Sequence, residues 1–392
     1  MTAGKVPGCK LTLLLRQKRR SGCEHSPSLP ATTILCNSTT IQTLALECTV
    51  RPKLSLLTEH LLRPTLRTLL GGLTFSAFAI TAQADTFNIA WDNDLFTGTD
   101  RGYTNGLKLS YLTASADDQQ KKSASLARGA KDAVGFLPGL NSQTQEHALA
   151  FSLRQLMVTP ADITASEPQL DDLPYAGFLF ASTTLWSWDA NSITGYGVHL
   201  GVVGPESGAE ESQKWAHELT GNETPNGWDH QLGTDVLGGV QAAHARKIMH
   251  SGSPDDLEQE VSLLGSAMLS SFKTNGRIGL VWRIGQYLPI NFVPDYAGTA
   301  STIGMPGALN ANGRGWSVFL GMGLEYVPYS YLDENSDPFR FDESLVQGQV
   351  GIGGTWQWNQ LQLAMILRAT TGEEETNKDN FSFGTLSLTW AL

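Results

Sequence analysis

The strongest constraint on the fold is a period-two alternation of apolar with small or polar residues, which recurs in short segments. In 316–326 every second residue is large and apolar: Trp316, Val318, Leu320, Met322, Leu324 and Tyr326. The residues between them are small or polar, except Phe319. The same alternation follows in 350–358, 361–367 and 386–392. Because successive side chains of a strand point to opposite faces, each segment predicts a strand with one apolar face.

No stretch after Ala84 is apolar enough for a transmembrane helix, so a membrane location would require a closed barrel. Several predicted strands carry Trp or Tyr at an end, as the aromatic girdles of membrane barrels require. The soluble alternative is a β-sandwich with one wet face, which would leave ordinary charged residues on its strands. Here charge gathers in loops such as Thr371–Asn380. The pattern therefore favours an all-β chain folded as an outer-membrane β-barrel.

The first 84 residues differ from the rest and predict export. Arg63 and Arg67 precede the short apolar stretch Leu69–Ala79, and Ala82–Ala84 is a small-x-small cleavage site. This is the three-part pattern of a secretory signal, and the apolar run is too short to span a membrane.

Three domains follow from this pattern. Residues 61–84 are the predicted signal peptide, and residues 85–392 are the predicted transmembrane barrel. Residues 1–60 have no place in the signal pattern. We interpret them as an upstream start-site artefact or extension, in preference to a cytoplasmic domain.

Cysteine and charge also separate the leader from the rest. All four cysteines lie in the leader: Cys9, Cys23, Cys36 and Cys48. The whole chain has 27 Lys/Arg and 38 Asp/Glu, of which the leader holds ten and three, so residues 85–392 hold 17 and 35. A cysteine-free, acidic, exported chain suits an oxidising periplasm and an outer membrane. The acidity argues against nucleic-acid binding and would attract divalent cations.

Counting the alternating runs predicts twelve antiparallel strands. They begin near Thr86, Thr104, Gln145, Phe178, Ser192, Val236, Leu257, Asn275, Arg314, Gln347, Leu361 and Phe381. An even count puts both termini on the periplasmic side, where Asn359-Gln360 would be a tight turn. The connections expected to face outward are Asp94–Tyr103, Thr159–Tyr175, Gly204–Asp235 and Pro328–Leu345. Thr113–Thr144 and Asn291–Gly313 would be unusually long periplasmic connections.

Three clusters of polar and glycine residues stand out in the outward connections. Asp92–Phe96 is followed by Thr99–Gly106, at the end of the first predicted strand and the start of the second. Leu173–Gly177 enters the fourth strand, where a structural role is the simpler interpretation. The third cluster runs from Gly204 to Gln231.

The third cluster predicts a short helix in an extracellular loop. Ser207 and Glu210 would form a capping box, and Gly221 would end the helix. The residues expected to pack on the barrel are Trp215, Ala216 and Leu219. The residues expected on one polar face are Glu210, Gln213 and His217, and Glu223 follows in the loop.

Taken in order, these clusters resemble the lipid A 3-O-deacylase family of outer-membrane, calcium-dependent enzymes. The resemblance runs from about Thr86 to the end of the chain and is strongest between Asn93 and Gln231. It implies a twelve-stranded barrel, in agreement with the independent strand count. It also implies hydrolysis of the ester that holds the 3′-acyloxyacyl group on lipid A in the outer leaflet.

The family's functional residues match five positions of this chain: Asn93, Asp94, Thr104, His217 and Glu223. The implied chemistry is physically sensible. A neutral imidazole can accept a proton from water near pH 7, and carboxylate and amide oxygens suit Ca²⁺. Asp94 and Glu223 are the expected metal ligands, and bound Ca²⁺ could polarise the ester carbonyl. The chain contains no Gly-x-Ser-x-Gly motif, which makes a serine acyl-enzyme less favoured.

Two departures from the family pattern leave other functions open. The connection Thr113–Thr144 is inserted, and Thr159–Leu173 offers no lysine to contact a substrate phosphate. The alternatives are a non-catalytic structural barrel or narrow channel on the same scaffold, and an outer-membrane phospholipid esterase. A lone loop histidine is usually a surface residue, and Asp92-Asn93-Asp94 is equally good as a turn. The sequence leaves the oligomeric state undetermined.

We predict that the exported protein begins at Asp85, because Ala82–Ala84 follows an apolar run of signal-peptide length. N-terminal sequencing of the protein recovered from cell envelopes measures this directly. A start upstream of Leu69 would contradict the prediction.

Overall fold

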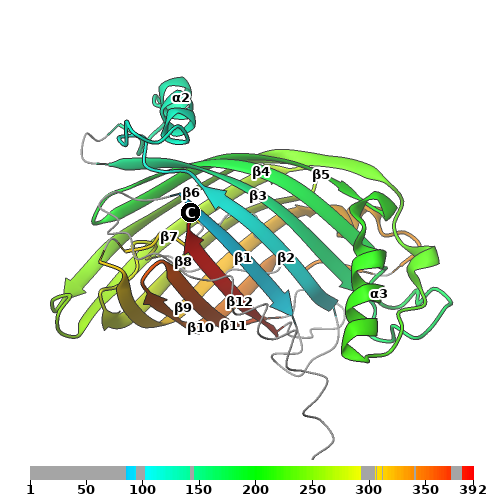
Figure 1. The fold of residues 1–392 in the computed structure, drawn as a ribbon. Helices are drawn as coiled ribbons and strands as arrows, with labels where there is room; N and C mark the ends of the chain where they lie inside the picture. The colour runs from blue at the N-terminus through cyan, green and yellow to red at the C-terminus, as the bar shows by residue number, and fades with distance from the viewer. Residues whose placement is uncertain are drawn as a thin grey trace, which may run out of the picture. The chain divides into compact units, whose positions relative to one another are not determined.

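The computed structural model describes residues 85–93, 102–141, 145–292, 305, 307–310, 312–339, 341–371 and 382–392, with the side chains of 102–105 left out. In this part of the chain, twelve antiparallel strands form one closed barrel, in which β1 pairs with both β2 and β12 (Figure 1). The predicted signal peptide and Asp94 lie outside the described residues. Within the described ranges, no helix has the length and apolar character needed to cross a membrane.

Every strand begins within two residues of its predicted start, so the predicted fold class is confirmed. The strands are β1 (Thr86–Asn93), β2 (Gly102–Leu112), β3 (Glu146–Thr159), β4 (Ala176–Trp188), β5 (Ser192–Val203), β6 (Asp235–Ser251), β7 (Glu258–Ser270), β8 (Lys273–Gln286), β9 (Arg314–Ser330), β10 (Val346–Trp358), β11 (Leu361–Thr370) and β12 (Ser382–Ala391). Each strand pairs with its neighbours in sequence, so the barrel is a simple up-and-down meander.

Short helices lie in the connections. They are α2 (Ala124–Val134), α3 (Ala209–Thr220) and α4 (Tyr331–Asn335), with single 3₁₀ turns η2 (Pro205–Ser207) and η3 (Trp228–His230). The sequence predicted α3, which Gly221 ends in a left-handed conformation as expected. It did not predict α2 or α4.

The outer wall carries the predicted apolar face. In β9 the six alternating residues from Trp316 to Tyr326 are all exposed, whereas Phe319 on the other face is buried. Side chains on the wall of a membrane barrel are exposed to lipid rather than water, so an exposed apolar face is the expected arrangement. The alternation in β10, β11 and β12 follows the same rule.

The strands define two rims. The rim that holds Asp85, Leu392 and the tight turn Asn359-Gln360 is called here the terminal rim. The opposite rim, called here the site rim, holds the connection from β5 to β6, which contains α3. The two long connections, 113–145 and 287–313, lie at the terminal rim as predicted.

Two apolar clusters pack inside the barrel, one towards each rim. At the site rim the cluster comprises Leu156, Ala176, Phe178, Phe180, Val203, Leu232, Leu237, Met268, Phe272, Tyr331 and Phe383. At the terminal rim it comprises Leu112, Ala148, Ala150, Trp186, Trp188, Ile193, Ala245, Phe292, Met305 and Ala308. Phe292, Met305 and Ala308 come from the β8–β9 connection, so this connection folds into the barrel.

Charged residues are not confined to loops, contrary to the sequence-based expectation. Inside the barrel, Glu325 accepts hydrogen bonds from Asn275 at 2.6 Å and Arg277 at 2.9 Å. Lys273 pairs with Glu343 of the β9–β10 connection at 2.5 Å. A buried charge is tolerated only when it is paired and hydrogen-bonded, and these groups are. A strand pattern places them on the inner face but cannot reveal partners that are distant in sequence.

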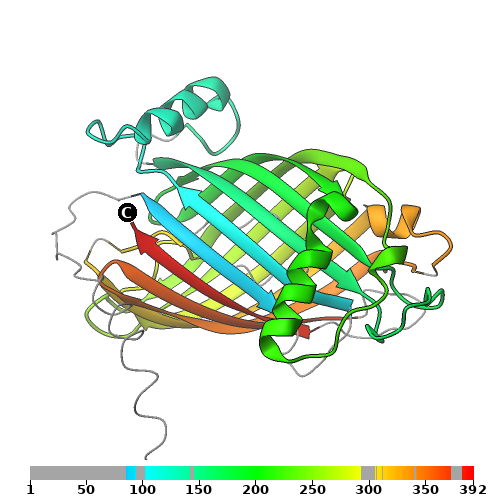
Figure 2. The same cartoon turned by 45° about the vertical axis from the view of Figure 1, so that its right-hand side comes forward.

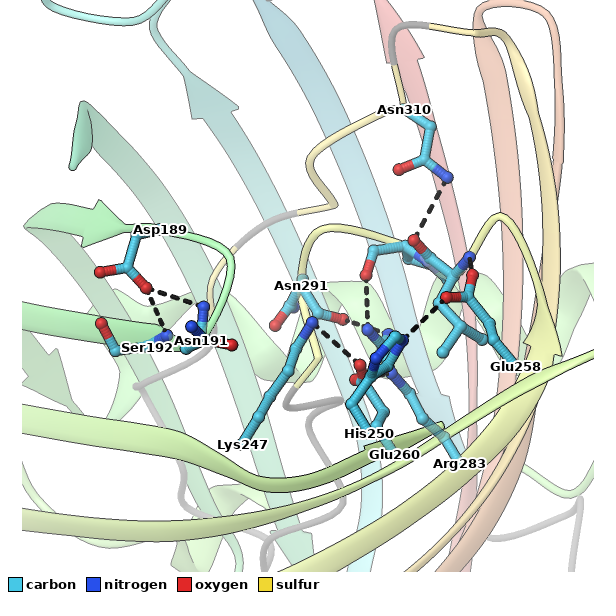
Figure 3. A network of polar contacts seen from close by, with 12 residues as sticks. Asp189, Asn191, Ser192, Lys247, His250, Glu258, Glu260, Arg283, Asn291 and Asn310 are labelled. Carbon is cyan, nitrogen blue, oxygen red and sulfur yellow. Dashed lines mark hydrogen bonds and ion pairs between the residues drawn. The ribbon is translucent and has the colours of Figure 1, made fainter. Parts of the chain in front are cut away.

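A second ionic network holds the β8–β9 connection in place (Figure 3). Glu260 pairs with both Arg283 and Lys247, the latter at 2.9 Å. Arg283 also donates to the backbone carbonyls of Pro289 at 2.7 Å and Asn291 at 3.1 Å. One buried guanidinium therefore joins the barrel wall to the connection that enters the barrel at the terminal rim.

We expect the terminal rim to face the periplasm. An epitope tag inserted in 372–380, between β11 and β12 at the site rim, should be labelled by antibody on intact cells. A tag at Asn359-Gln360 should be labelled only after the outer membrane is permeabilised. Labelling in the reverse pattern would contradict this orientation.

Candidate functional site

Of the predicted site residues, Asn93, His217 and Glu223 are described with their side chains, and all three lie at the site rim. Asn93 ends β1 and pairs with Asn105 near the start of β2. In β1, Asn93 shares the outward-facing alternation of Trp91, yet its side chain is buried. Figures 1 and 2 both show α3 beside the wall where β1 ends. The connection that carries His217 and Glu223 therefore comes to the same part of the rim as Asn93.

Thr104 lies at an irregularity in the pairing of β2 with β3. Tyr103 pairs with Val158 and Asn105 with Met157, so Thr104 is the additional residue of a β-bulge. A bulge re-aims side chains locally and is common beside functional sites. The side chain of Thr104 lies outside the description. The backbone irregularity therefore falls at the position that the family resemblance selected.

Close contact holds α3 on the outer wall. Gln155, on the outer face of β3, donates from Nε2 to the carbonyl of Ser207 at 2.7 Å. Gly177 of β4 lies directly beneath, where a Cβ would fall 2.1 Å from Ser207 Oγ and 2.4 Å from Ala209 Cβ. Only glycine permits this approach. The Gly177 position was assigned to strand entry from sequence, and here it determines how closely the loop packs.

The predicted capping box is wrong. The N-cap of α3 is Gly208 in a left-handed conformation, and no side chain caps the helix. Ser207 instead ends η2, and its Oγ accepts from the Ala209 amide at 3.3 Å. The preceding Gly204 also has a positive φ of 99°. Two glycines thus let the chain turn from β5 into η2 and from η2 into α3.

The predicted packing face of α3 is wrong for Trp215 and Leu219, whereas Ala216 is half-buried. Trp215 and Leu219 are 66% and 70% exposed, whereas Gln213 is buried. Gln213 Oε1 accepts from Trp228 Nε1 at 2.7 Å, and the buried Trp228 ring lies 4.9 Å from that of Tyr175. A polar side chain faces the wall because a buried indole N–H needs an acceptor.

The β3–β4 connection supports this packing. Tyr175 donates from its hydroxyl to the carbonyl of Ile163 at 3.0 Å, and burial raises the pKa of Tyr175 to about 12. The phenol therefore stays protonated and keeps this bond throughout the physiological pH range. The backbone N–H of Asn226 donates to the same Ile163 carbonyl at 2.8 Å. The connections β3–β4 and β5–β6 thus stabilise each other at the site rim.

His217 lies in the last turn of α3, and Nδ1 is 2.6 Å from the backbone carbonyl of Glu223. A carbonyl oxygen only accepts, so Nδ1 must carry the proton, and Nε2 of the neutral ring is then an acceptor. In the described part of the chain Nε2 has no hydrogen-bond partner. The Glu223 backbone, rather than its carboxylate, orients the ring.

The predicted metal ligands are only partly described. Asp94 lies outside the described residues, and the carboxylate of Glu223 is exposed near His217. Among the residues that are described, no three His, Cys, Asp or Glu side chains come together as a metal site. Asn93 and Glu223 supply oxygen donors of the kind that Ca²⁺ prefers.

A buried network supports β1 from inside the barrel. Asp92 pairs with Arg154 of β3 at 3.0 Å and accepts from Thr385 of β12 at 2.6 Å. Arg368 of β11 donates to Thr385 at 2.6 Å. Asp92 therefore cross-links three strands directly behind Asn93. The alternation of β1 could have assigned Asp92 to the inner face, but no sequence pattern identifies its partners.

We predict that Gly177→Ala displaces α3 while the barrel stays folded, because the new Cβ would overlap Ser207 and Ala209. Misplacing a catalytic group by about 1 Å can cost on the order of 10²-fold in rate. Limited trypsin digestion at Lys214 should become faster, and ester hydrolysis slower. Gly233→Ala is the matched control in the same connection, because its Cβ would meet nothing within 4 Å. Equal digestion of the two variants would refute the close-packing argument.

Comparisons with known proteins agree with this architecture. Residues 67–392 match the family model described as outer membrane protein LpxR. No curated protein sequence matches the chain.

Among solved structures, LpxR from Salmonella typhimurium has 18% sequence identity and a TM-score of 0.62, covering 78% of this chain and 100% of that one. The β domain of the Bordetella autotransporter BrkA has 8% identity and a TM-score of 0.38, covering 79% and 99%. At these identities, the Salmonella structure supports the fold alone. The family match spans most of the chain, including every strand of the barrel, and the chain belongs to the LpxR family of outer-membrane proteins.

Proposed function

We propose that this protein is an outer-membrane esterase that hydrolyses the 3′-acyloxyacyl ester of lipid A with water activated by His217 and with Ca²⁺ as cofactor. Membership of the LpxR family implies a lipid A deacylase. The finer proposal depends on one observation, the contact between His217 Nδ1 and the Glu223 carbonyl at 2.6 Å. This contact sets the tautomer that a general base requires.

His217 can take a proton from water at Nε2 while Nδ1–H stays bonded to the carbonyl. As the ring becomes positively charged, the carbonyl of Glu223 still accepts from Nδ1. The last turn of α3 adds a second stabilising effect, because the C-terminal end of a helix carries partial negative charge. The imidazolium can then return the proton to the departing alkoxide.

Ca²⁺ would be held by oxygen atoms of Asn93, Asp94 and Glu223. The buried amide of Asn93 and the exposed carboxylate of Glu223 suit a hard cation. When bound, Ca²⁺ supplies positive charge that stabilises a developing oxyanion. Asp92 is committed to Arg154 and Thr385, so its role is to position the end of β1 rather than to bind metal.

The position of α3 on the outer wall supports a lipid substrate. Lipid that diffuses in the leaflet reaches the outer wall without entering the barrel. Trp215 and Leu219, exposed on one flank of α3, offer apolar contact to acyl chains. His217 lies on a different flank of the same helix, where a headgroup-proximal ester could approach it.

The channel alternative receives little support from the interior. Apolar clusters and buried ion pairs lie inside the barrel towards each rim, so side chains occupy the lumen there. The phospholipid alternative shares the same chemistry. It differs in the substrate that must be recognised, so product analysis separates the two.

We predict that His217→Ala lowers the rate of ester hydrolysis by on the order of 10²–10⁴, the range for a lost general base. The measurement is acyl-chain release from purified lipid A, followed by mass spectrometry. His230→Ala is the matched control, because His230 is an exposed histidine in the same connection. Phospholipid vesicles assayed in parallel test the alternative substrate. Wild-type rates for His217→Ala would refute the mechanism.

A calcium titration separates the metal ligands from the base. Asp94→Ala should move the activation curve to higher Ca²⁺, whereas His217→Ala should leave Ca²⁺ binding intact, because imidazole is a poor ligand for this cation. Glu223→Ala keeps the backbone carbonyl that orients His217. If Glu223 binds metal, its curve should shift as that of Asp94→Ala does. An unshifted curve with normal turnover would show that the Glu223 carboxylate has no part in the site.

A further inference from the structure

The β2–β3 connection, residues 113–141, forms a small lobe outside the barrel at the terminal rim. Figures 1 and 2 show α2 standing beside the outer wall, off the ends of β3 and β4. The lobe packs on the barrel: α2 contacts β3 and β4. Five residues of the lobe are fully or nearly fully buried: Ala114, Ala116, Ala124, Ala127 and Leu140. It is therefore a folded element with a defined place.

The lobe covers a polar part of the wall that would otherwise contact lipid. His147, Ser187 and Thr194 occupy outward-facing positions of β3, β4 and β5, yet all three are buried. His147 Nδ1 is 2.6 Å from Ser187 Oγ. A Cβ at Gly139 would fall 2.8 Å from Thr194 Oγ1, which places the lobe directly over Thr194.

Polar contacts anchor the lobe to the barrel. The carboxylate of Asp85, just before β1, accepts from the Ala114 amide at 2.6 Å and from Ser123 Oγ at 2.5 Å. It also pairs with Lys121 at 3.6 Å. Tyr196, on the outer face of β5, donates to the carbonyl of Pro138 at 2.9 Å. The lobe is thus held at the level where the wall meets the terminal rim.

The remaining surface of the lobe combines apolar side chains with positive charge. Phe136 is 78% exposed and Leu126 is 51% exposed. The run 121–131 contains four cations, Lys121, Lys122, Arg128 and Lys131, and no acidic residue. Residues 113–141 also contain Asp117, Asp118 and Asp132, so four cations against three carboxylates give the lobe a net charge of +1. Residues 85–392 as a whole, with 17 Lys/Arg and 35 Asp/Glu, carry −18. Local charge of this sign complements anionic lipid headgroups.

On the opposite side of the barrel, β9 and β10 mark the membrane interface at the same rim. Trp316, Trp356 and Trp358 are exposed on the wall within two residues of a strand end at the terminal rim. Exposed tryptophans gather where a membrane barrel crosses the headgroup layer. A segment fixed beside the wall at this level lies in the interface rather than in bulk water.

We propose that the β2–β3 lobe is an interfacial anchor that binds the periplasmic leaflet, with Phe136 and Leu126 among the acyl chains and with Lys122 and Lys131 at anionic phospholipid headgroups. An amphipathic helix with basic and apolar sides lies in a membrane interface in this way. The lobe would fix the depth of the barrel at one leaflet while the candidate site operates at the other. The proposal does not depend on the reaction at the site.

Spin labelling tests the proposal, because all native cysteines lie in the first 84 residues. In the full chain with those cysteines changed to serine, Phe136→Cys and Leu126→Cys would each carry a nitroxide. Asp132→Cys, at an exposed acidic position of α2, is the control. The proteins would be refolded into phosphatidylethanolamine–phosphatidylglycerol vesicles, and a heat-dependent gel shift would verify that each barrel is folded.

The ratio of oxygen to nickel-chelate accessibility reports depth in the bilayer. It should be several-fold higher at positions 136 and 126 than at 132. It should fall at both positions when phosphatidylcholine replaces phosphatidylglycerol, because the cations lose their anionic partners. Equal, water-like ratios at all three positions would overturn the anchor. Unchanged ratios in phosphatidylcholine would overturn the role of the lysines.

Discussion

Backbone hydrogen bonding is the constraint on which the rest of this structure depends. In a bilayer every N–H and C=O of a spanning segment must find a partner within the protein. Closing the sheet by pairing β1 with β12 meets that demand without a free edge. Closure also brings Asp92 of β1 next to Thr385 of β12, residues almost 300 positions apart in sequence. The network that supports the end of β1 is therefore a direct product of closure.

The inner and outer faces of the closed wall have different roles. The inner face buries charges in pairs, such as Glu325 with Arg277 and Glu260 with Arg283. Removing one partner of a buried pair costs about 3–5 kcal/mol, so these pairs strongly favour the observed register. The outer face is largely apolar, as the exposed residues of β9 show. At opposite rims, α3 and the β2–β3 lobe each pack on outward-facing positions that contact lipid elsewhere.

Packing a loop on the outside of a barrel has a functional consequence. The wall supplies rigidity, and the loop supplies groups that a strand pattern cannot hold, such as an imidazole at a helix end. The hydrogen bond between Gln213 and Trp228 sets the rotation of α3 about its own axis. The Glu223 carbonyl sets the orientation of the His217 ring. The imidazole of His217 is thereby held outside the barrel by elements that form hydrogen bonds of their own.

The sequence by itself determined the barrel, the strand starts and the connection that carries His217, because a two-residue period, tight turns and helix-ending glycines are local signals. It did not determine which face of α3 packs, since Trp215 and Leu219 look like core residues until the wall beneath them is known. Gly177 and Gln155 select Ala209 and Gln213 as the inner face instead. The ion pairs inside the barrel, the bulge at Thr104 and the lobe over His147 were likewise decided by tertiary structure. Each depends on atoms brought together by register and closure, which no local pattern encodes.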